Sequence, residues 1–180
     1  MMRIELRRLG ATDAALFREI RLEGLARDPD AFGSTLEAES AQPLSLFEQR
    51  LEATAVFGAF RGSELLGVAG FRIQPGPKHG HKGLLWGMYV RPGARQTGIG
   101  RKLVEAVIEH ARRQVELLQL SVVSDNQAAR RLYASLGFKE YGIEPRAAKY
   151  RGKYHDDVLM TKLLTIDSAS DAAHRGGTLP

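Results

Sequence analysis

The stretch RQTGIG, Arg95-Gln96-Thr97-Gly98-Ile99-Gly100, decides the fold prediction. It lies between an apolar run at residues 84–90 and a segment from residue 101 with helical spacing of apolar side chains, so it predicts a strand, a turn and a helix. A helix that begins after such a turn has unpaired main-chain N–H groups at its N-terminus, where the helix dipole adds partial positive charge. Glycine lets an anion approach without meeting a Cβ. The stretch therefore predicts a phosphate-binding turn.

Two common glycine motifs do not fit this turn. A P-loop requires lysine and then serine or threonine after its second glycine, but Ile99 and Gly100 stand at these positions. A dinucleotide-binding fingerprint that begins at Gly98 requires a third glycine where the chain has Leu103, and it follows the first strand rather than the fourth. An arginine and two glycines at a helix start instead suit a pyrophosphate.

The composition is typical of one globular domain with a charged ligand. Of the 180 residues, 43% are hydrophobic and 26% charged, which argues against a disordered chain. Cysteine is absent, which excludes disulfides, thiolate metal sites and a cysteine acyl-enzyme. The net charge of +5 favours a polyanionic ligand. Because no basic run is interleaved with aromatic residues, we expect a phosphorylated cofactor rather than nucleic acid.

The sequence also bears on location and on metals. The apolar runs are shorter than the ~20 residues of a membrane-spanning helix. Residues 1–8 alternate charged and apolar side chains, which is typical of a strand and not of a signal peptide. We therefore expect a cytoplasmic protein with no membrane partner. His79 and His81 form an isolated His-x-His pair without a third predicted ligand, so we expect no metal site.

Apolar spacing and turn residues divide the chain into alternating elements. In chain order they predict a strand at 3–8, a helix ending near 28, a helix around 44–51, strands at 55–60, 65–73 and 84–90, a helix from 99, a strand at 117–123, a helix from 126 to 136, and strands around 138–141 and 154–164. Thr12 or Asp13 is predicted to cap the first helix, while Ser45 and Glu48 have the capping-box spacing at the second.

This order of elements predicts a single α/β domain with a mixed sheet flanked by helices. We place the domain at residues 1–165. Residues 166–180 lack apolar periodicity and are predicted to form a flexible C-terminal tail.

Taken together, these segments resemble the GNAT superfamily of acetyl-coenzyme A dependent N-acetyltransferases. The turn fits the family's R/Q-x-x-G-x-G/A pattern, and the segment from Asn126 to Phe138 is similar to its N-x-x-A-x-x-x-Y-x-x-x-G-F element. The resemblance covers most of residues 1–164. It implies a mostly antiparallel sheet whose fourth and fifth strands splay apart, and acetyl-CoA as cosubstrate.

The resemblance also implies contacts to that cosubstrate. A bulge at Gly87 would open the gap between the strands, and one main-chain N–H there would polarise the thioester carbonyl. In the helix from Asn126, steps of 100° place Arg130 and Tyr133 near Asn126 on one face. The implied contacts are the main chain of Met88, Tyr89 and Val90 with the pantetheine arm, the turn residues Arg95, Gln96, Thr97, Gly98, Ile99 and Gly100 with the pyrophosphate, and Asn126, Arg130 and Tyr133 on the helix.

Tyr133 has two interpretations. A tyrosine beside an apolar helix face is typical of a packed core aromatic. The resemblance implies instead that its hydroxyl points at the cofactor sulfur and acts as the catalytic acid.

The sequence does not identify the general base. Many relatives carry a glutamate on the fourth strand, but residues 84–88 contain no titratable side chain. Water, His79, His81, Glu23 or Glu39 are the alternatives. Asp156 and Asp157, late in the chain, are predicted to be solvated.

The function that follows from the resemblance is transfer of acetyl from acetyl-CoA to a primary amine by direct attack. A small-molecule amine is expected as acceptor, entering beside the loop at residues 28–35, and a homodimer is compatible with this prediction. The alternatives are a protein or peptide acetyltransferase that modifies N-termini or lysines, and a non-catalytic module that senses acyl-CoA.

Overall fold

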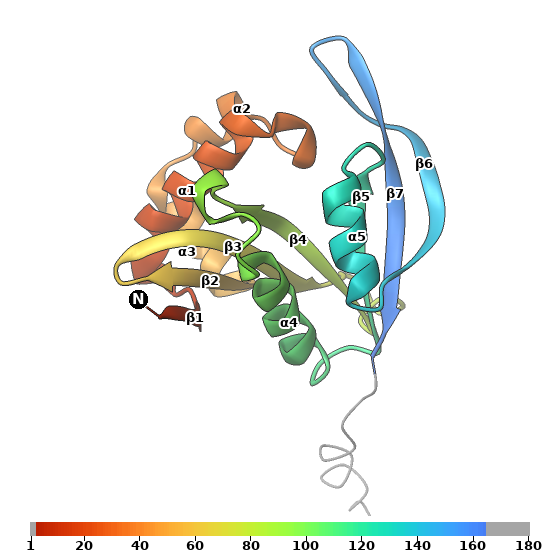
Figure 1. The fold of residues 1–180 in the computed structure, drawn as a ribbon, viewed down its shortest axis with the longest axis horizontal. Coiled ribbons are helices and arrows are strands. Elements are labelled where there is room, and N and C mark those ends of the chain that lie inside the picture. The colour runs from red at the N-terminus through yellow and green to blue at the C-terminus, as the bar shows by residue number, and fades with distance from the viewer. Residues whose placement is uncertain (1–2, 165–180) are drawn as a thin grey trace, which may run out of the picture.

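Seven strands form one sheet in the order β1-β2-β3-β4-β5-β7-β6 in the computed structural model, which describes residues 3–164 (Figure 1). Only β4 and β5 are parallel, and every other neighbouring pair is antiparallel. The mixed, mostly antiparallel sheet is therefore confirmed. The strands are β1 Ile4–Arg8, β2 Ala55–Arg61, β3 Glu64–Ile73, β4 Lys82–Val90, β5 Leu117–Val123, β6 Lys139–Tyr150 and β7 Lys153–Leu163.

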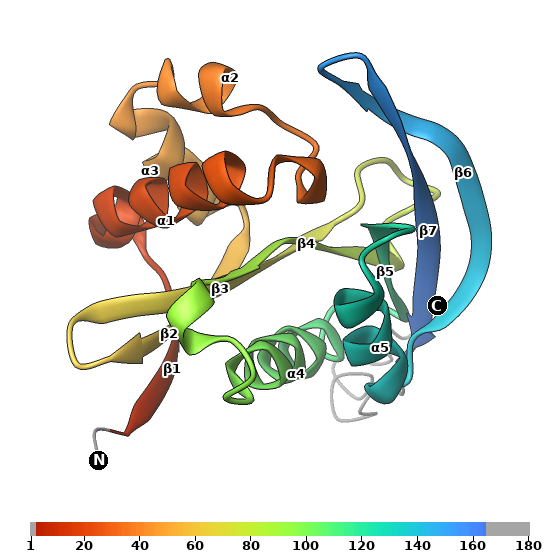
Figure 2. The same ribbon diagram turned by 45° about the horizontal axis from the view of Figure 1, so that its top comes forward.

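Helices cover both faces of the sheet (Figure 2). One core cluster joins α1 and α3 to β2 and β3 through side chains such as Phe17, Phe47 and Val68. A second lies under α4, where Leu103 and Val107 are fully buried. The helices are α1 Ala14–Arg27, α2 Leu36–Ser40, α3 Leu44–Ala53, α4 Ile99–Ala111 and α5 Gln127–Ser135, with short 3-10 turns η1 Ala11–Asp13, η2 Pro29–Ala31 and η3 Pro92–Ala94.

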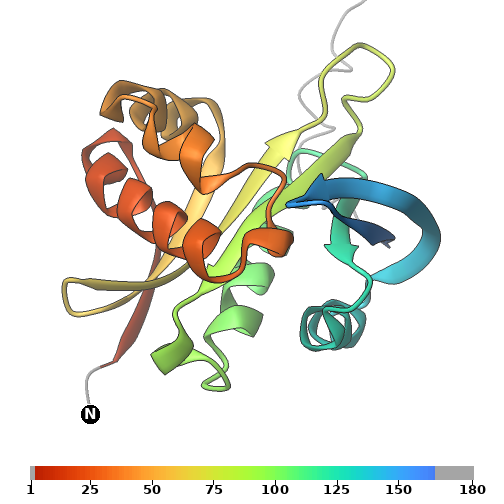
Figure 3. The ribbon, with the colours of Figure 1, turned by 90° about the horizontal axis from the view of Figure 1, so that it is seen from above.

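The strands β4 and β5 diverge, as predicted (Figure 3). They pair only from Lys82 opposite Leu117 to Leu84 opposite Gln119. Beyond this point, no strand within residues 3–164 pairs with the edge of β4 that faces β5. The sheet is split at its centre, and a ligand can lie between the two strands.

A bulge in β4 accompanies the divergence. The register between β3 and β4 shifts between Val68 and Gly70, so that Gly87 and Met88 together stand opposite one residue of β3. Gly87 has φ +62°, a left-handed conformation that glycine adopts without steric cost. The predicted bulge at Gly87 is confirmed.

Asp13 is the N-cap residue of α1, one of the two predicted, but neither predicted side-chain cap forms. Asp13 stands at the N-cap of α1, but its carboxylate accepts hydrogen bonds from the Gly10 N–H at 2.9 Å and from Arg7 instead. At α3, the N-cap residue is Pro43 and no side chain caps the helix, because the helix begins one residue before Ser45. The predicted capping box at that helix therefore does not form.

Two elements differ from their predicted extent. The short helix α2 was not predicted; Thr35 caps it by accepting a hydrogen bond from the Ala38 N–H at 3.2 Å. Strand β6 continues to Tyr150 rather than ending near residue 141, and the β6–β7 hairpin extends beyond the end of β5 (Figure 1). None of the helices in residues 3–164 is long and apolar enough to cross a membrane.

Truncation after Thr165 is expected to change the free energy of unfolding by no more than ~0.5 kcal/mol. The reason is that Leu164, which follows β7, is buried and donates its N–H to the Glu116 carbonyl at 2.8 Å, and the truncated protein keeps both contacts. The predicted tail at 166–180 lies outside the described residues. Urea unfolding of both forms measures the change, and a loss of several kcal/mol would show that the tail stabilises the domain.

Candidate functional site

The turn before α4 presents unpaired main-chain donors. Gly98, the N-cap of α4, has φ +85°, and Gln96 has φ +62°. In the described part of the chain, the N–H groups of residues 96–101 donate to no main-chain acceptor outside the helix. Left-handed residues beside a helix start gather such N–H groups into a concave anion site. The turn thus has the geometry of the predicted pyrophosphate site.

Arg95 is held in place at this turn. Its Nε donates to the Val90 carbonyl oxygen at 3.0 Å, and its Nη2 pairs with Asp28 Oδ2 at 2.5 Å. The guanidinium also lies 5.7 Å from the centre of the Tyr89 ring. An anion bound at the turn would therefore meet an oriented guanidinium that is linked to η2 through Asp28.

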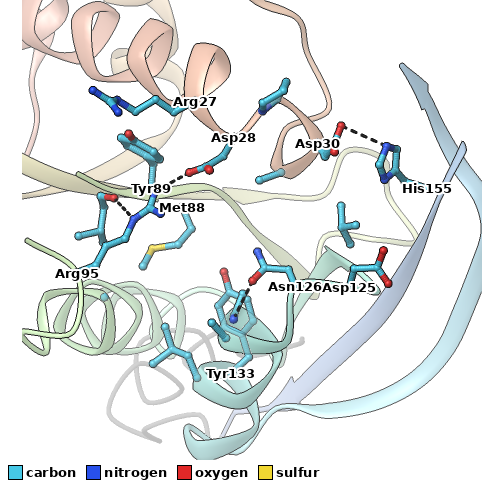
Figure 4. Close-up of a pocket in the computed structure, with 18 of the residues that line it drawn as sticks. Arg27, Asp28, Asp30, Met88, Tyr89, Arg95, Asp125, Asn126, Tyr133 and His155 are labelled. Carbon is cyan, nitrogen blue, oxygen red and sulfur yellow. Dashed lines mark hydrogen bonds and ion pairs between the residues drawn. The ribbon is translucent and has the colours of Figure 1, made fainter. Parts of the chain in front are cut away.

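A cavity of about 700 Å³ extends from this turn along α5 (Figure 4). It is bounded by η2, the end of β4, the turn and α5. The predicted cofactor contacts that line it are Met88, Tyr89, Val90, Arg95, Gln96, Gly100, Asn126 and Tyr133.

Two further cavities adjoin the first. One, of about 230 Å³, lies in the gap between β4 and β5 and shares Met88, Asn126 and Tyr133 with the first cavity. The other, of about 480 Å³, lies beneath α1 and α3 and shares Trp86, Gly87 and other residues with the gap. Together, the three cavities lead from the turn, through the split in the sheet, to the face covered by the first helices.

Asn126 and Tyr133 place polar atoms in this path. The Asn126 Oδ1 accepts a hydrogen bond from the Ala129 N–H at 3.1 Å and so caps α5, which leaves its amide nitrogen to donate elsewhere. Tyr133 is 5% exposed and packs edge-on against Phe138. No hydrogen bond among residues 3–164 involves its hydroxyl, and burial raises the pKa of Tyr133 above its ordinary value. The phenol therefore stays protonated at neutral pH.

Four predicted cofactor contacts do not line the first cavity: Thr97, Gly98, Ile99 and Arg130. The Thr97 hydroxyl donates to the Ala94 carbonyl at 2.6 Å, and Ile99 is buried in the core. Arg130 points away, because its guanidinium donates to Glu140 Oε1 at 2.8 Å and to the Ser124 carbonyl at 3.0 Å. The turn residues can still act through their main chain, but the geometry does not place Arg130 at the cavity.

The four side chains considered as general base are poorly placed for that role. Glu39 is 2% exposed between Arg21 and Arg50. Burial alone would raise the pKa of Glu39, but the two guanidinium groups outweigh it and lower the pKa, so the carboxylate is already fully paired. His79 and His81 line none of the three cavities.

Glu23 is engaged as well. It accepts a hydrogen bond from the Tyr89 hydroxyl at 3.0 Å and pairs with Arg91 at 3.0 Å. Burial and this hydrogen bond raise the pKa of Tyr89 to about 12. Glu23 therefore serves to hold α1 against the end of β4.

The acidic groups that line the gap are Asp30 and Asp157. Asp157 is half-buried on β7, opposite Val123 of β5, and is not fully solvated as predicted. Nearby, the buried His155 lies 3.2 Å from Asp30 Oδ1. Asp30 belongs to the loop at residues 28–35 that was predicted beside the acceptor. His155 was not predicted, and neither was the half-buried position of Asp157, because both depend on the pairing of β7 with β5.

Comparison with known proteins gives a consistent result. Residues 21–138 match the Acetyltransferase (GNAT) family. The L-methionine sulfoximine/L-methionine sulfone acetyltransferase of Salmonella typhimurium is 34% identical over 86 residues, which are 47% of this chain and 50% of that protein. The mycothiol acetyltransferase of Thermomonospora curvata is 29% identical over 136 residues, 73% of this chain and 42% of that protein. The chain thus spans about half the length of these curated relatives, or less.

A solved structure extends the comparison to the whole fold. The ribosomal-protein-alanine N-acetyltransferase of Brucella melitensis superposes with a TM-score of 0.79 at 28% identity, over 89% of this chain and 99% of that one. Members of the matched family are acyl-CoA-dependent N-acetyltransferases that use acetyl-CoA. The family match covers well over half of the chain and includes the turn, the split strands and α5. The chain belongs to the acetyltransferase (GNAT) family.

Proposed function

We propose that this protein transfers the acetyl group of acetyl-CoA to a primary amine by direct attack of the amine on the thioester. The observation that carries the proposal is a row of three adjoining cavities with shared lining residues, from the turn before α4, past Tyr133, to the cavity beneath α1 and α3. Two substrates that enter from opposite ends of this path would meet at the bulge in β4.

The residues present suit the cofactor. The unpaired N–H groups of residues 96–101 and the Arg95 guanidinium would hold the pyrophosphate. A Cβ at Gly98 would meet no atom within 4 Å, whereas one at Gly100 would lie 3.2 Å from Met88 Cε, so the wall of the site is closest at Gly100. The unpaired edge of β4 at Met88–Val90 would bind the pantetheine arm as a strand would.

Acetyl-CoA, when bound, supplies an activated thioester. Groups of this chain would then orient the thioester and protonate the departing thiolate. A main-chain N–H at the bulge would donate to the thioester carbonyl oxygen, and the Asn126 amide would hold the arm. The protonated Tyr133 would give its proton to the departing thiolate. Asp30 and Asp157, the carboxylates of the gap, would accept the proton of the amine.

A small-molecule amine is the acceptor that we favour. The cavity of about 480 Å³ beneath α1 and α3 has the size of a small-molecule site, and two of the related enzymes are named for small-molecule substrates. The second candidate is acetylation of a protein N-terminus, which the similarity to the ribosomal-protein-alanine N-acetyltransferase favours. A cytoplasmic location and a homodimer stay predictions.

Release of free CoA thiol from acetyl-CoA, measured against a panel of small amines and of peptides with free N-termini, tests the proposal. We expect release with small amines at higher kcat/KM than with peptides. Faster turnover of peptides would favour the second candidate. Binding of acetyl-CoA without release in the presence of any acceptor would instead indicate a sensing module.

A further inference from the structure

The cavity beneath α1 and α3 carries an excess of positive charge. Its charged lining residues are Arg21, Arg50, Arg72 and Glu39, which are three guanidinium groups and one carboxylate. The other polar side chains of the lining include the hydroxyls of Ser34 and Ser121. The cavity therefore has more positive than negative charge at neutral pH.

The carboxylate of this lining, Glu39, is already paired with two arginines. Glu39 accepts from Arg21 Nε at 3.1 Å, pairs with Arg21 Nη2, and accepts from Arg50 Nη1 at 3.3 Å. Arg21 is 6% exposed, and its guanidinium lies 5.0 Å from the centre of the Phe32 ring and 5.9 Å from that of Trp86. Glu39 therefore compensates the buried charge of Arg21 but has little capacity left for a ligand.

One nitrogen of Arg21 lies beside Gly87. Its Nη1 forms no hydrogen bond within residues 3–164, while a Cβ built on Gly87 would lie 3.1 Å from it. Gly87 forms the bulge of β4 in the gap. A free guanidinium donor thus lies beside the point at which the two substrates would meet.

Arg72 is a further cation of the lining, and its side chain is exposed. It stands on β3 opposite Leu84, and within the described residues it forms no ion pair and no side-chain hydrogen bond. Leu84 and Gly87 are three residues apart on β4, ~10 Å in extended chain. Arg72 and Gly87 line the same cavity, so one small molecule bound there can contact both.

We propose that this cavity selects an acceptor amine that also carries a carboxylate, of the size of an amino acid. The carboxylate would pair with Arg72, the amine would lie at Gly87, and the Arg21 guanidinium would add to the positive charge of the cavity. The charge excess disfavours polyamines and other acceptors whose remaining groups are cationic. The proposal rests on the proposed function, because it names the substrate class of the same site.

The first test compares matched acceptors. Thiol release would be measured with the proteinogenic L-amino acids and, for the best of them, with the corresponding decarboxylated amine and amino-acid amide. The rates are expressed per neutral amine, since removal of the carboxylate changes the pKa of the amine. We expect kcat/KM to be at least ~10-fold higher for the amino acid, as for the loss of one charged hydrogen bond. An equal or higher kcat/KM for the decarboxylated amine or for the amino-acid amide would overturn the proposal.

The second test uses Arg72→Ala, Arg72→Lys and, as a control, Arg113→Ala, an exposed arginine on the α4 side of the sheet. Arg72→Ala should lower kcat/KM for the amino acid ~10-fold or more, mainly through KM, and change that of the decarboxylated amine little. Arg72→Lys should retain part of the preference, because it keeps the charge but loses the bidentate geometry. Arg113→Ala should behave as the unmutated protein.

The outcomes separate this proposal from the proposed function. An equal loss by Arg72→Ala with both acceptors would assign Arg72 a structural role and overturn the proposal. Turnover confined to amines without a carboxylate, or to peptides, would overturn it and leave acetyl transfer intact. If acetyl-CoA neither raised the melting temperature nor released thiol with any acceptor, both this proposal and the proposed function would be overturned.

Discussion

Replacement of Tyr133 by phenylalanine is expected to slow the chemical step of acetyl transfer by ~100-fold or more, the usual effect of removing a positioned general acid. The substitution keeps the ring, which packs against Phe138, and removes only the hydroxyl. Because no protein group within residues 3–164 is hydrogen-bonded to that hydroxyl, the free energy of unfolding should change by less than ~1 kcal/mol. The affinity for acetyl-CoA should be nearly unchanged.

The measurement is single-turnover acetyl transfer across pH, since product release can mask the chemical step in the steady state. Burial raises the pKa of Tyr133, so its proton is retained through neutral and mildly alkaline pH, and the difference between the two proteins should persist over that range. A rate within a few-fold of the unmutated protein at every pH would mean that Tyr133 is a core aromatic and that another group or water protonates the thiolate.

Gly100→Glu is expected to abolish stabilisation by acetyl-CoA. At one hundred times Kd the unmutated protein should gain ~2.7 kcal/mol, which raises its melting temperature by several degrees. Gly100 lines the first cavity at the start of α4, so the glutamate places a negative charge where the pyrophosphate would bind. The new Cβ would lie 3.2 Å from the flexible end of Met88, which can move, so the fold should form.

Gly100→Ala is the matched control, because it adds the Cβ without the charge. Thermal melts with and without acetyl-CoA should show a shift for the unmutated protein and for Gly100→Ala, but none for Gly100→Glu. A full shift in Gly100→Glu would place the pyrophosphate elsewhere. No shift in the unmutated protein would contradict the assignment of the turn.

Local patterns predicted the elements that build the site. The turn at residues 95–100 and the bulge at Gly87 depend on glycines that are visible in the sequence, and the structure has φ +85° at Gly98 and φ +62° at Gly87. The helix face of Leu103 and Val107 is likewise buried as its spacing predicts. Such features are set by residues close together in the chain.

Other features depend on tertiary contacts and were missed. Helix α2 has only five residues, too few for an apolar period. Strand β6 has mostly exposed side chains, and its length is set by pairing with β7 rather than by its own sequence. The predicted face of α5 included Arg130, but Glu140 on β6 draws that side chain away from the cavity.

The acceptor side of the site illustrates the same limit. Arg21, Glu39 and Arg50 come from three different helices, and their ion pairs join residues 18 and 11 positions apart. Asp157 reaches the gap only because β7 inserts between β5 and β6. No spacing rule within one element predicts these contacts, which is why the general base stayed open among side chains that are absent from the gap or already paired.

Product analysis tests the central claim most directly. The protein would be incubated with acetyl-CoA carrying an isotopic label in the acetyl group and with the best acceptor of the panel, and mass spectrometry would follow the label. We predict that labelled N-acetylated acceptor and free CoA appear in equal amounts, at a rate that depends on both substrates. Tight binding of acetyl-CoA with no labelled acceptor, for small amines and peptides alike, would contradict the account.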